Sequence, residues 1–207
     1  MKILALEFSS SQRAVALSDG ANPIARVVTD NLKTSPLLLI DKVLEKGRTD
    51  RAEINVIALG IGPGSYTGIR SAIAVAQGWQ LAKSVKLSPI SSAEVLAATA
   101  RAQGQRGETH LIIDAQRHEH YHTTWNLTET EQTETKPLSI IGVVEAFELE
   151  SFGPDQPGMR YCKPLHPCAV QLAKLAANRN SDVPGFTIEP IYLRQTEFVK
   201  APPPRKL

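Results

Sequence analysis

The chain has 207 residues, of which 42% are apolar and 21% charged, and its formal net charge at pH 7 is +2. These proportions are typical of a soluble globular protein of one or two domains, and so small a charge does not by itself indicate a nucleic-acid surface. Glu7 interrupts the apolar start of the chain before it reaches the length of a signal peptide, and no apolar run approaches a membrane span. With Cys162 and Cys168 as the only cysteines, we expect a cytoplasmic protein.

The first half of the chain predicts the element order β-β-β-α-β-α-α. Turn signals at Ser18-Asp19-Gly20 and Asn22-Pro23 separate the first strands, which indicates an antiparallel meander. Thr34-Ser35-Pro36 is a helix start signal, and Ser91-Ser-Ala-Glu94 reads as a capping box. The expected strands are Lys2–Ser9, Arg13–Leu17, Pro23–Thr29 and Ile54–Leu59, and the expected helices are Pro36 to about Lys46, 69–83, and Ser91 to about Arg101.

The second half predicts a smaller α+β unit that begins near residue 104. We therefore expect an N-terminal lobe over residues 1–103, carrying partner-binding helices, and a C-terminal lobe over 104–207 with a Pro-rich tail. The expected elements are strands His110–Asp114 and Glu119–Asn126, a polar hairpin tip or mobile loop Thr128–Pro137, a short helix within Ile140–Glu150, a Gly/Pro-rich loop Ser151–Pro157, an amphipathic helix Pro167–Asn178 and a late strand Ile188–Leu193. In the tail, Arg194, Lys200, Arg205 and Lys206 form a thin basic end that we expect to be solvated.

A glycine-rich loop follows the strand Ile54–Leu59 and leads into the helix 69–83. It lacks the Lys-Ser/Thr pair of a P-loop and fails the dinucleotide fingerprint in both registers. Two readings stay open with equal weight: an anion site at the helix N-terminus, or close packing of backbone that only glycine permits. An anion or nucleotide would be contacted by Gly62, Gly64, Ser65, Thr67, Gly68 and Arg70.

Five motifs together resemble the TsaB (YeaZ) family, in the same order and at matching spacings. They are Ile3-Leu-Ala-Leu-Glu-Phe-Ser9, Gly60-Ile-Gly-Pro-Gly-Ser-Tyr-Thr-Gly-Ile-Arg70, Ile90-Ser-Ser-Ala-Glu94, Ile113-Asp-Ala-Gln-Arg117 and Pro190-Ile-Tyr-Leu-Arg194. The resemblance covers nearly the whole chain. It implies an α/β fold of the actin/sugar-kinase/Hsp70-like (ribonuclease H-like) class, with two lobes of which the second is reduced.

The resemblance also implies a function and partners. TsaB proteins are non-catalytic relatives of TsaD, the glycoprotease-like enzyme that transfers a threonylcarbamoyl group to an adenosine beside the anticodon of certain tRNAs, and TsaD needs them. A third, ATP-hydrolysing subunit (TsaE-like) joins the assembly. We therefore expect no catalytic residues and no cofactor of its own in this chain. ATP or ADP with magnesium would bind at the interface of the complex, and the chain would contact tRNA only indirectly, through the complex.

The chain departs from the family pattern at Glu7, at His118 and in the first long helix, which lacks the histidine often seen near its start; the last two departures leave the fold prediction intact. Glu7 stands where members have an aspartate, a residue that helps hold metal or phosphate in nucleotide-binding relatives. The longer side chain would misplace such a ligand. His118 stands where the family has a small residue.

The helices near Pro36 and over 69–83 suggest a partner surface. Leu37-Leu-Leu-Ile40 point nearly all round a helix axis, so at least one should face away from the core; the alternative is a helix sunk fully inside the domain. Ser71, Ala72, Ala74, Ala76 and Gly78 leave a low surface where another helix could approach closely. The expected interface comprises Leu37, Leu38, Leu39, Ile40, Val43, Leu44, Ala72, Ala76 and Trp79. Without a partner, the same surface should form a homodimer.

Other candidate sites are weaker. His118, His120 and His122 would share one strand face, but they would spread over roughly 13 Å, too far for one metal ion, so a solvated face is favoured. Asp114 and Glu119 could form a pair of catalytic carboxylates, but a salt-bridge role for them in the hairpin is favoured. Ser65 lacks the G-x-S-x-G context of a hydrolase nucleophile. An ATP-dependent kinase-like enzyme of the same fold and a metallopeptidase remain as alternatives.

Overall fold

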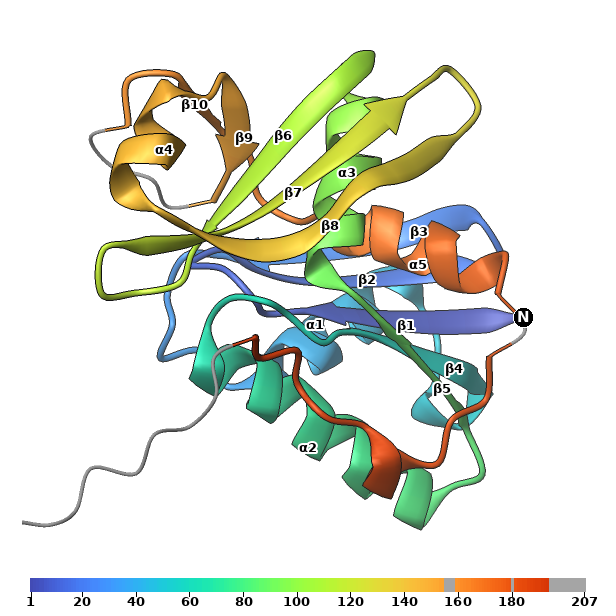
Figure 1. Cartoon of the computed structure of the whole chain (residues 1–207). Coiled ribbons are helices and arrows are strands. Elements are labelled where there is room, and N and C mark those ends of the chain that lie inside the picture. The colour runs from blue at the N-terminus through green and yellow to red at the C-terminus, as the bar shows by residue number, and fades with distance from the viewer. Residues whose placement is uncertain (155–158, 180, 194–207) are drawn as a thin grey trace, which may run out of the picture.

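The computed structural model describes residues 1–154, 159–179 and 181–193. Two five-stranded sheets organise the chain, as Figure 1 shows, with one helix layer between them and another below the first sheet. The Pro-rich tail predicted at the C-terminus, with Arg194, Lys200, Arg205 and Lys206, lies outside the described residues.

The first sheet has the strand order β3-β2-β1-β4-β5. Strands β1, β2 and β3 are antiparallel, whereas β4 and β5 run parallel to β1. The predicted meander is therefore confirmed. The strands are β1 (Lys2–Glu7), β2 (Arg13–Asp19), β3 (Asn22–Thr29), β4 (Ile54–Gly60) and β5 (Lys86–Ile90).

Both faces of this sheet are buried because alternate residues of its central strands are apolar on both sides. Leu4 and Leu6 pack against helices α1 (Pro36–Gly47) and α2 (Tyr66–Ala82), whereas Ile3 and Ala5 pack against α5 (Ala169–Ala177). Helix α3 (Ser92–Ala102) contributes to this second core and to the core under the other sheet. It thus joins the two sheets.

The second sheet has the order β10-β9-β6-β7-β8. Its elements are β6 (Gly107–Asp114), β7 (Glu119–Leu127), β8 (Gln132–Gly142), α4 (Val143–Glu148), β9 (Ser151–Gly153) and β10 (Cys162–Pro164). The predicted β6–β7 hairpin and the short helix are confirmed. The predicted polar loop Thr128–Pro137 is wrong beyond residue 131, because the threonine-rich segment forms the edge strand β8, in which Thr133 to Pro137 are all exposed.

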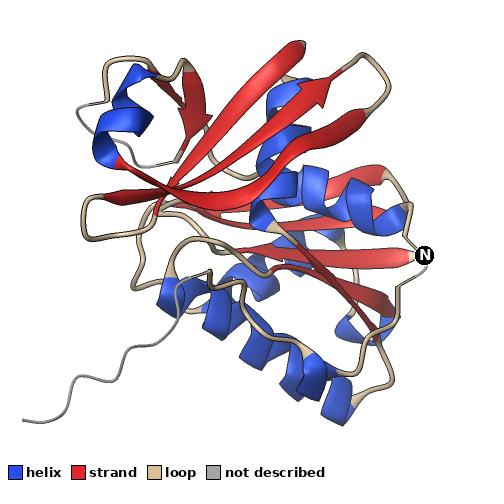
Figure 2. Ribbon diagram, viewed as in Figure 1, coloured by secondary structure: helices blue, strands red, loops and turns tan. Residues whose placement is uncertain are grey.

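The last described segment returns to the first sheet and runs beside α2 (Figure 1). The backbone N–H of Val183 donates to the Leu87 carbonyl at 3.1 Å, and that of Ile191 donates to the Ile61 carbonyl at 2.8 Å. The predicted strand Ile188–Leu193 is wrong, because this segment forms no ladder of backbone hydrogen bonds. It contacts the glycine loop through the Ile191–Ile61 hydrogen bond instead. Figure 2 shows it as loop interrupted by one helical turn, the 3-10 helix η2 (Gly185–Thr187).

This arrangement is the predicted actin/sugar-kinase/Hsp70-like fold: a meander followed by parallel strands linked through helices in the order 3-2-1-4-5, with a second, smaller lobe. The division of the chain after residue 103 stays a prediction, and α5 crosses it to cover the first sheet. None of the helices in the described part of the chain combines the length and apolarity that a membrane crossing needs.

Candidate functional site

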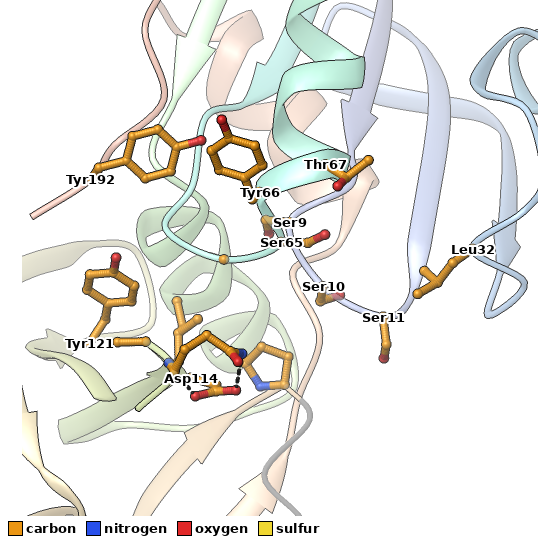
Figure 3. Close-up of a pocket in the computed structure, with 15 residues that line it drawn as sticks. Ser9, Ser10, Ser11, Leu32, Ser65, Tyr66, Thr67, Asp114, Tyr121 and Tyr192 are labelled. Atoms are coloured by element: carbon orange, nitrogen blue, oxygen red, sulfur yellow. Dashed lines mark hydrogen bonds between the residues drawn. The ribbon is translucent and has the colours of Figure 1, made fainter. Parts of the chain in front are cut away.

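A cleft of about 560 Å³ opens where the ends of the two sheets meet. Figure 3 shows hydroxyl groups of the β1–β2 turn and of the glycine loop on one side, and Asp114 and Tyr121 of the second sheet on the other. The lining residues are Ser9, Ser10, Ser11, Leu32, Gly64, Ser65, Tyr66, Thr67, Ile113, Asp114, Ala115, Gln116, Tyr121, Pro154 and Tyr192. The cleft carries little charge, since Asp114 is the single carboxylate among these described lining residues and none of them is Lys, Arg or His.

The glycines of the loop permit close backbone packing against the end of β1. A Cβ atom on Gly64 would overlap the Ser9 carbonyl oxygen, and one on Gly68 would overlap the carbonyl oxygen of Phe8. Gly64 also has a φ of +141°, in the region that favours glycine. Backbone packing thus explains these two glycines, whether or not a ligand binds in the cleft.

The predicted ligand contacts divide into two groups. Gly64, Ser65 and Thr67 line the cleft, and the Ser65 hydroxyl caps α2 by accepting from the Gly68 N–H at 3.3 Å. Gly62, Gly68 and Arg70 are not among its lining residues. The Gly62 N–H donates to the Ser92 hydroxyl at 3.1 Å, and the Arg70 guanidinium lies 4.3 Å from the centroid of the Tyr66 ring.

Glu7 is fully buried behind the glycine loop rather than in the cleft. Its carboxylate accepts hydrogen bonds from the Ser9 N–H at 2.9 Å and from the Ser92 hydroxyl at 3.2 Å. Gly60 makes room for it, because a Cβ there would overlap the carboxylate. Burial raises the pKa of Glu7, and the hydrogen bonds from Ser9 and Ser92 oppose part of that rise.

Magnesium with a nucleotide phosphate is the group that the fold would place at this position. The residues do not fit it: the Glu7 carboxylate faces two serines inside the protein and supplies no oxygen to the cleft. Asp114 accepts hydrogen bonds from the backbone and side chain of Gln116, each at 2.7 Å. The described residues hold no group of three His, Cys, Asp or Glu side chains arranged to bind a metal ion.

The β6–β7 turn beside the cleft is held in an unfavourable backbone conformation. Gln116, Arg117 and His118 have φ values of 63°, 58° and 62°, where non-glycine residues are uncommon. Asp114 holds this turn through its bonds to Gln116. The departure at His118 therefore falls at a position where glycine would be less strained.

The three predicted surface histidines are not on a solvated strand face. His118 lies in the turn, whereas His120 and His122 are 8% and 7% exposed, since α4 and the residues around Met159 cover that face of the sheet. The His122 ring stacks on His110, with Nε2 3.1 Å from Nδ1. Burial, followed by the adjacent His110, lowers the pKa of His122.

The predicted partner surface is smaller than the sequence suggests. Leu37 and Leu38 are 51% and 47% exposed, as expected for a helix with more apolar residues than one core can cover. Trp79 is half-buried beside Leu37, in a groove of about 320 Å³. The remaining predicted interface residues belong to the chain's own core, which corrects their assignment: Leu39, Ile40, Val43, Leu44, Ala72 and Ala76.

Helix α2 nevertheless presents a low, open stripe. Ala74 and Gly78 are exposed, Ser71 is half-buried next to them, and nothing would contact a Cβ on Gly78 within 4 Å. Beyond them Leu81 is 91% exposed. Leu37 and Trp79 line one groove between α1 and α2. We use the name α1–α2 face for the following exposed or half-buried residues of these two helices: Leu37, Leu38, Ser71, Ala74, Gly78, Trp79 and Leu81.

Sequence reasoning missed several residues of the cleft. Ser9 to Ser11, Asp114, Tyr121 and Tyr192 come from three segments, the β1–β2 turn, the β6–β7 hairpin and the last described segment, and only the fold brings these together. The run of three serines directly after a buried strand was the one signal available. Arg13, buried at the start of β2, was also missed.

Comparisons with known proteins place these features in a family. Residues 2–157 match the model of the TsaD family, described as tRNA N6-adenosine threonylcarbamoyltransferase. The chain is 32% identical over 125 residues to the tRNA threonylcarbamoyladenosine biosynthesis protein TsaB of Escherichia coli strain K12, covering 58% of this chain and 53% of that protein. The Haemophilus influenzae protein of the same name is 29% identical over 123 residues, covering 58% and 52%. The chain spans about half the length of these curated relatives.

Solved structures agree with the fold. A crystal structure of a Pseudomonas aeruginosa protein described as similar to peptidase YEAZ superposes with a TM-score of 0.79 at 24% identity, covering 93% of this chain and 99% of that one. A second structure, YeaZ from Pseudomonas aeruginosa, has a TM-score of 0.77 at 24% identity with the same coverage.

Proposed function

The chain belongs to the TsaD family, and from that membership we propose that it is a non-catalytic subunit that docks on a TsaD-like enzyme in the threonylcarbamoyl modification of tRNA. The single observation that carries this proposal is the α1–α2 face. A water-exposed stripe with large apolar side chains beside small ones suits a second helix that approaches closely. The proposed pathway, tRNA threonylcarbamoyladenosine biosynthesis, is taken from the names of the TsaB relatives.

The chemistry of the cleft supports a role without catalysis. A catalytic constellation needs a nucleophile or base with a paired helper. The Glu7 carboxylate is engaged inside the protein by Ser9 and Ser92, and Asp114 holds its own turn. The Ser65 hydroxyl caps α2 by accepting from the Gly68 N–H, so a helix N-terminus rather than an adjacent base fixes its position.

The rest of the assembly follows from the same proposal. An ATPase subunit of the TsaE kind would join the complex, and ATP or ADP with magnesium would bind at the interface between subunits rather than at Glu7. In the absence of the enzyme, the α1–α2 face would pair with the same face of a second copy, since self-packing across a two-fold axis covers identical patches.

The test is the affinity for the TsaD-like enzyme of the same organism. Leu38→Glu and Ala74→Arg alter exposed positions of the α1–α2 face, and Val144→Glu on α4, which is 73% exposed and far from that face, is the matched control (Figure 1). We expect wild type and V144E to form the complex and the other two variants to remain folded without binding.

Other outcomes would contradict the proposal in distinguishable ways. If the wild-type chain does not bind the enzyme but binds ATP with magnesium, the kinase-like alternative is supported. Zinc-dependent cleavage of peptides by the isolated chain would support the metallopeptidase alternative.

A further inference from the structure

Arg13 is a nearly buried cation without a carboxylate partner among the described residues. It is 7% exposed, and its Nε atom is buried without a hydrogen-bond partner in the described part of the chain. Its Nη1 donates to the Thr34 carbonyl at 3.3 Å, and the guanidinium carbon lies 5.8 Å from the centroid of the Phe8 ring. Charged groups at this depth are normally paired, because desolvation makes an unpaired charge costly.

The acidic residues at the ends of the two strands that flank β2 are engaged elsewhere. Glu7 accepts hydrogen bonds from Ser9 and Ser92, and Asp30 accepts from the Gln12 side chain at 3.4 Å. None of the ion pairs between described residues includes Arg13. Within the described ranges, no carboxylate therefore pairs with the guanidinium, and its Nε retains hydrogen-bonding capacity.

The position of Arg13 connects it to the first turn of α1. Along β2, Arg13 has the same parity as Val15 and Leu17, which pack in the core that contains α1. Its guanidinium bonds to Thr34, which comes directly before Ser35, the N-cap residue of α1. The segment before α1 also borders the cleft at Leu32, as Figure 3 shows.

The first turn of α1 lacks the groups that normally satisfy a helix N-terminus. The Ser35 side chain makes no capping hydrogen bond, and the first turn contains no acidic residue. The N–H groups there and the positive end of the helix dipole thus favour an anion. Leu37 and Leu38, the exposed apolar residues of the α1–α2 face, lie on this same turn.

We propose that this turn, with Arg13 beneath it, binds a carboxylate of the docking partner, from an acidic side chain flanked by apolar residues. The inference rests on the proposed function. It further predicts that the docking segment of the partner carries a negative charge. The carboxylate would accept from the first-turn N–H groups of α1 while the leucines contact its apolar neighbours. Arg13 would stabilise it across a region of low dielectric, where charge interactions are strong.

Two pairs of variants test this with the same enzyme. Arg13→Met keeps an unbranched side chain against Phe8 and removes the charge, and Arg26→Met is its control because Arg26 contacts Cys168 on the opposite face of the sheet. Ser35→Asp places a carboxylate of the chain's own at the N-terminus of α1, and Ser35→Asn caps the helix without charge. We expect R13M and S35D each to weaken the complex at least tenfold, and R26M and S35N to bind as wild type does.

The outcomes separate this inference from the proposed function. If L38E abolishes binding while R13M and S35D bind like their controls, the docking surface stands and the carboxylate site is wrong. If R13M fails to fold, the comparison of S35D with S35N decides alone, since an internal acid should raise thermal stability and still weaken binding. A wild-type chain that does not bind the enzyme overturns both.

Discussion

Tyr192 stacks on Tyr66, with ring centroids 5.7 Å apart and planes inclined by 26°. The contact joins the last described segment to the first residue of α2, at the rim of the cleft. The Ile191–Ile61 hydrogen bond lies next to it. The end of the described chain therefore holds in place both the glycine loop and the helix that carries much of the α1–α2 face.

Removing this ring should loosen the first turn of α2. We expect Tyr192→Ala to lower the free energy of unfolding by about 1 kcal/mol, the usual size of an aromatic pair beyond its buried area. It should also speed amide hydrogen exchange in α2. Tyr192→Phe keeps the stack and is the control. Equal stability of the two variants would show that the stack contributes nothing.

Glycine at position 118 should stabilise the protein. His118 has a φ of 62°, which costs a non-glycine residue about 1 kcal/mol. We therefore expect His118→Gly to raise the midpoint of thermal unfolding, whereas His118→Ala should not. The comparison isolates backbone strain from the loss of the imidazole. A lower midpoint for H118G than for H118A would refute strain at this turn.

The buried Glu7 should make stability depend on pH in a direction opposite to that of an ion-paired acid. Its folded pKa is raised above the ordinary value of 4.5, so between these two values the folded state binds more protons than the unfolded state. Stability from this group is therefore present at low pH and is lost as pH rises through the folded pKa.

Glu7→Gln removes that titration while keeping the side-chain shape. In urea unfolding from pH 5 to pH 8, we expect the stability of E7Q relative to wild type to increase with pH, by up to about 1.4 kcal/mol per unit within the window. A constant difference between E7Q and wild type would mean that Glu7 keeps its ordinary pKa.

The α1–α2 face should also set the oligomeric state of the isolated chain. We expect wild type to sediment as a dimer at micromolar concentration and Leu38→Glu as a monomer with unchanged circular dichroism, because a buried carboxylate without a partner is costly. Val144→Glu should remain dimeric. A monomeric wild type would remove the homodimer from the proposal while leaving binding to the enzyme open.

Local signals explain which parts of the fold could be predicted. The Ser-Pro start of α1 and the glycine and proline residues around β4 mark boundaries that depend on neighbouring residues alone. The polar residues of β8 and the segment after Ile188 depend instead on tertiary pairing: the former pair with the preceding strand β7, and the latter bonds to the distant residue Ile61. Hydrophobic periodicity carries no information on such pairing.

The candidate site shows the same division. The glycine loop was recognisable, but what its glycines approach is the backbone of Ser9 and Phe8, more than fifty residues earlier in the chain. The interface prediction treated Ala72 and Ala76 as exposed because a helix of small residues does not reveal which side faces its own core. The burial of His120 and His122 depends on α4, whose position the sequence does not specify.

The late return of α5 to the first sheet has a consequence for biosynthesis. On the ribosome, β1 and β2 emerge first, yet the apolar side chains of Ile3, Ala5 and Ala14 stay uncovered until Leu172 and Ala173 have been translated. Such a nascent chain exposes an apolar sheet face for most of its synthesis, and chaperones bind surfaces of this kind. A fragment that ends at residue 103 should consequently aggregate unless a peptide containing α5 is supplied in trans.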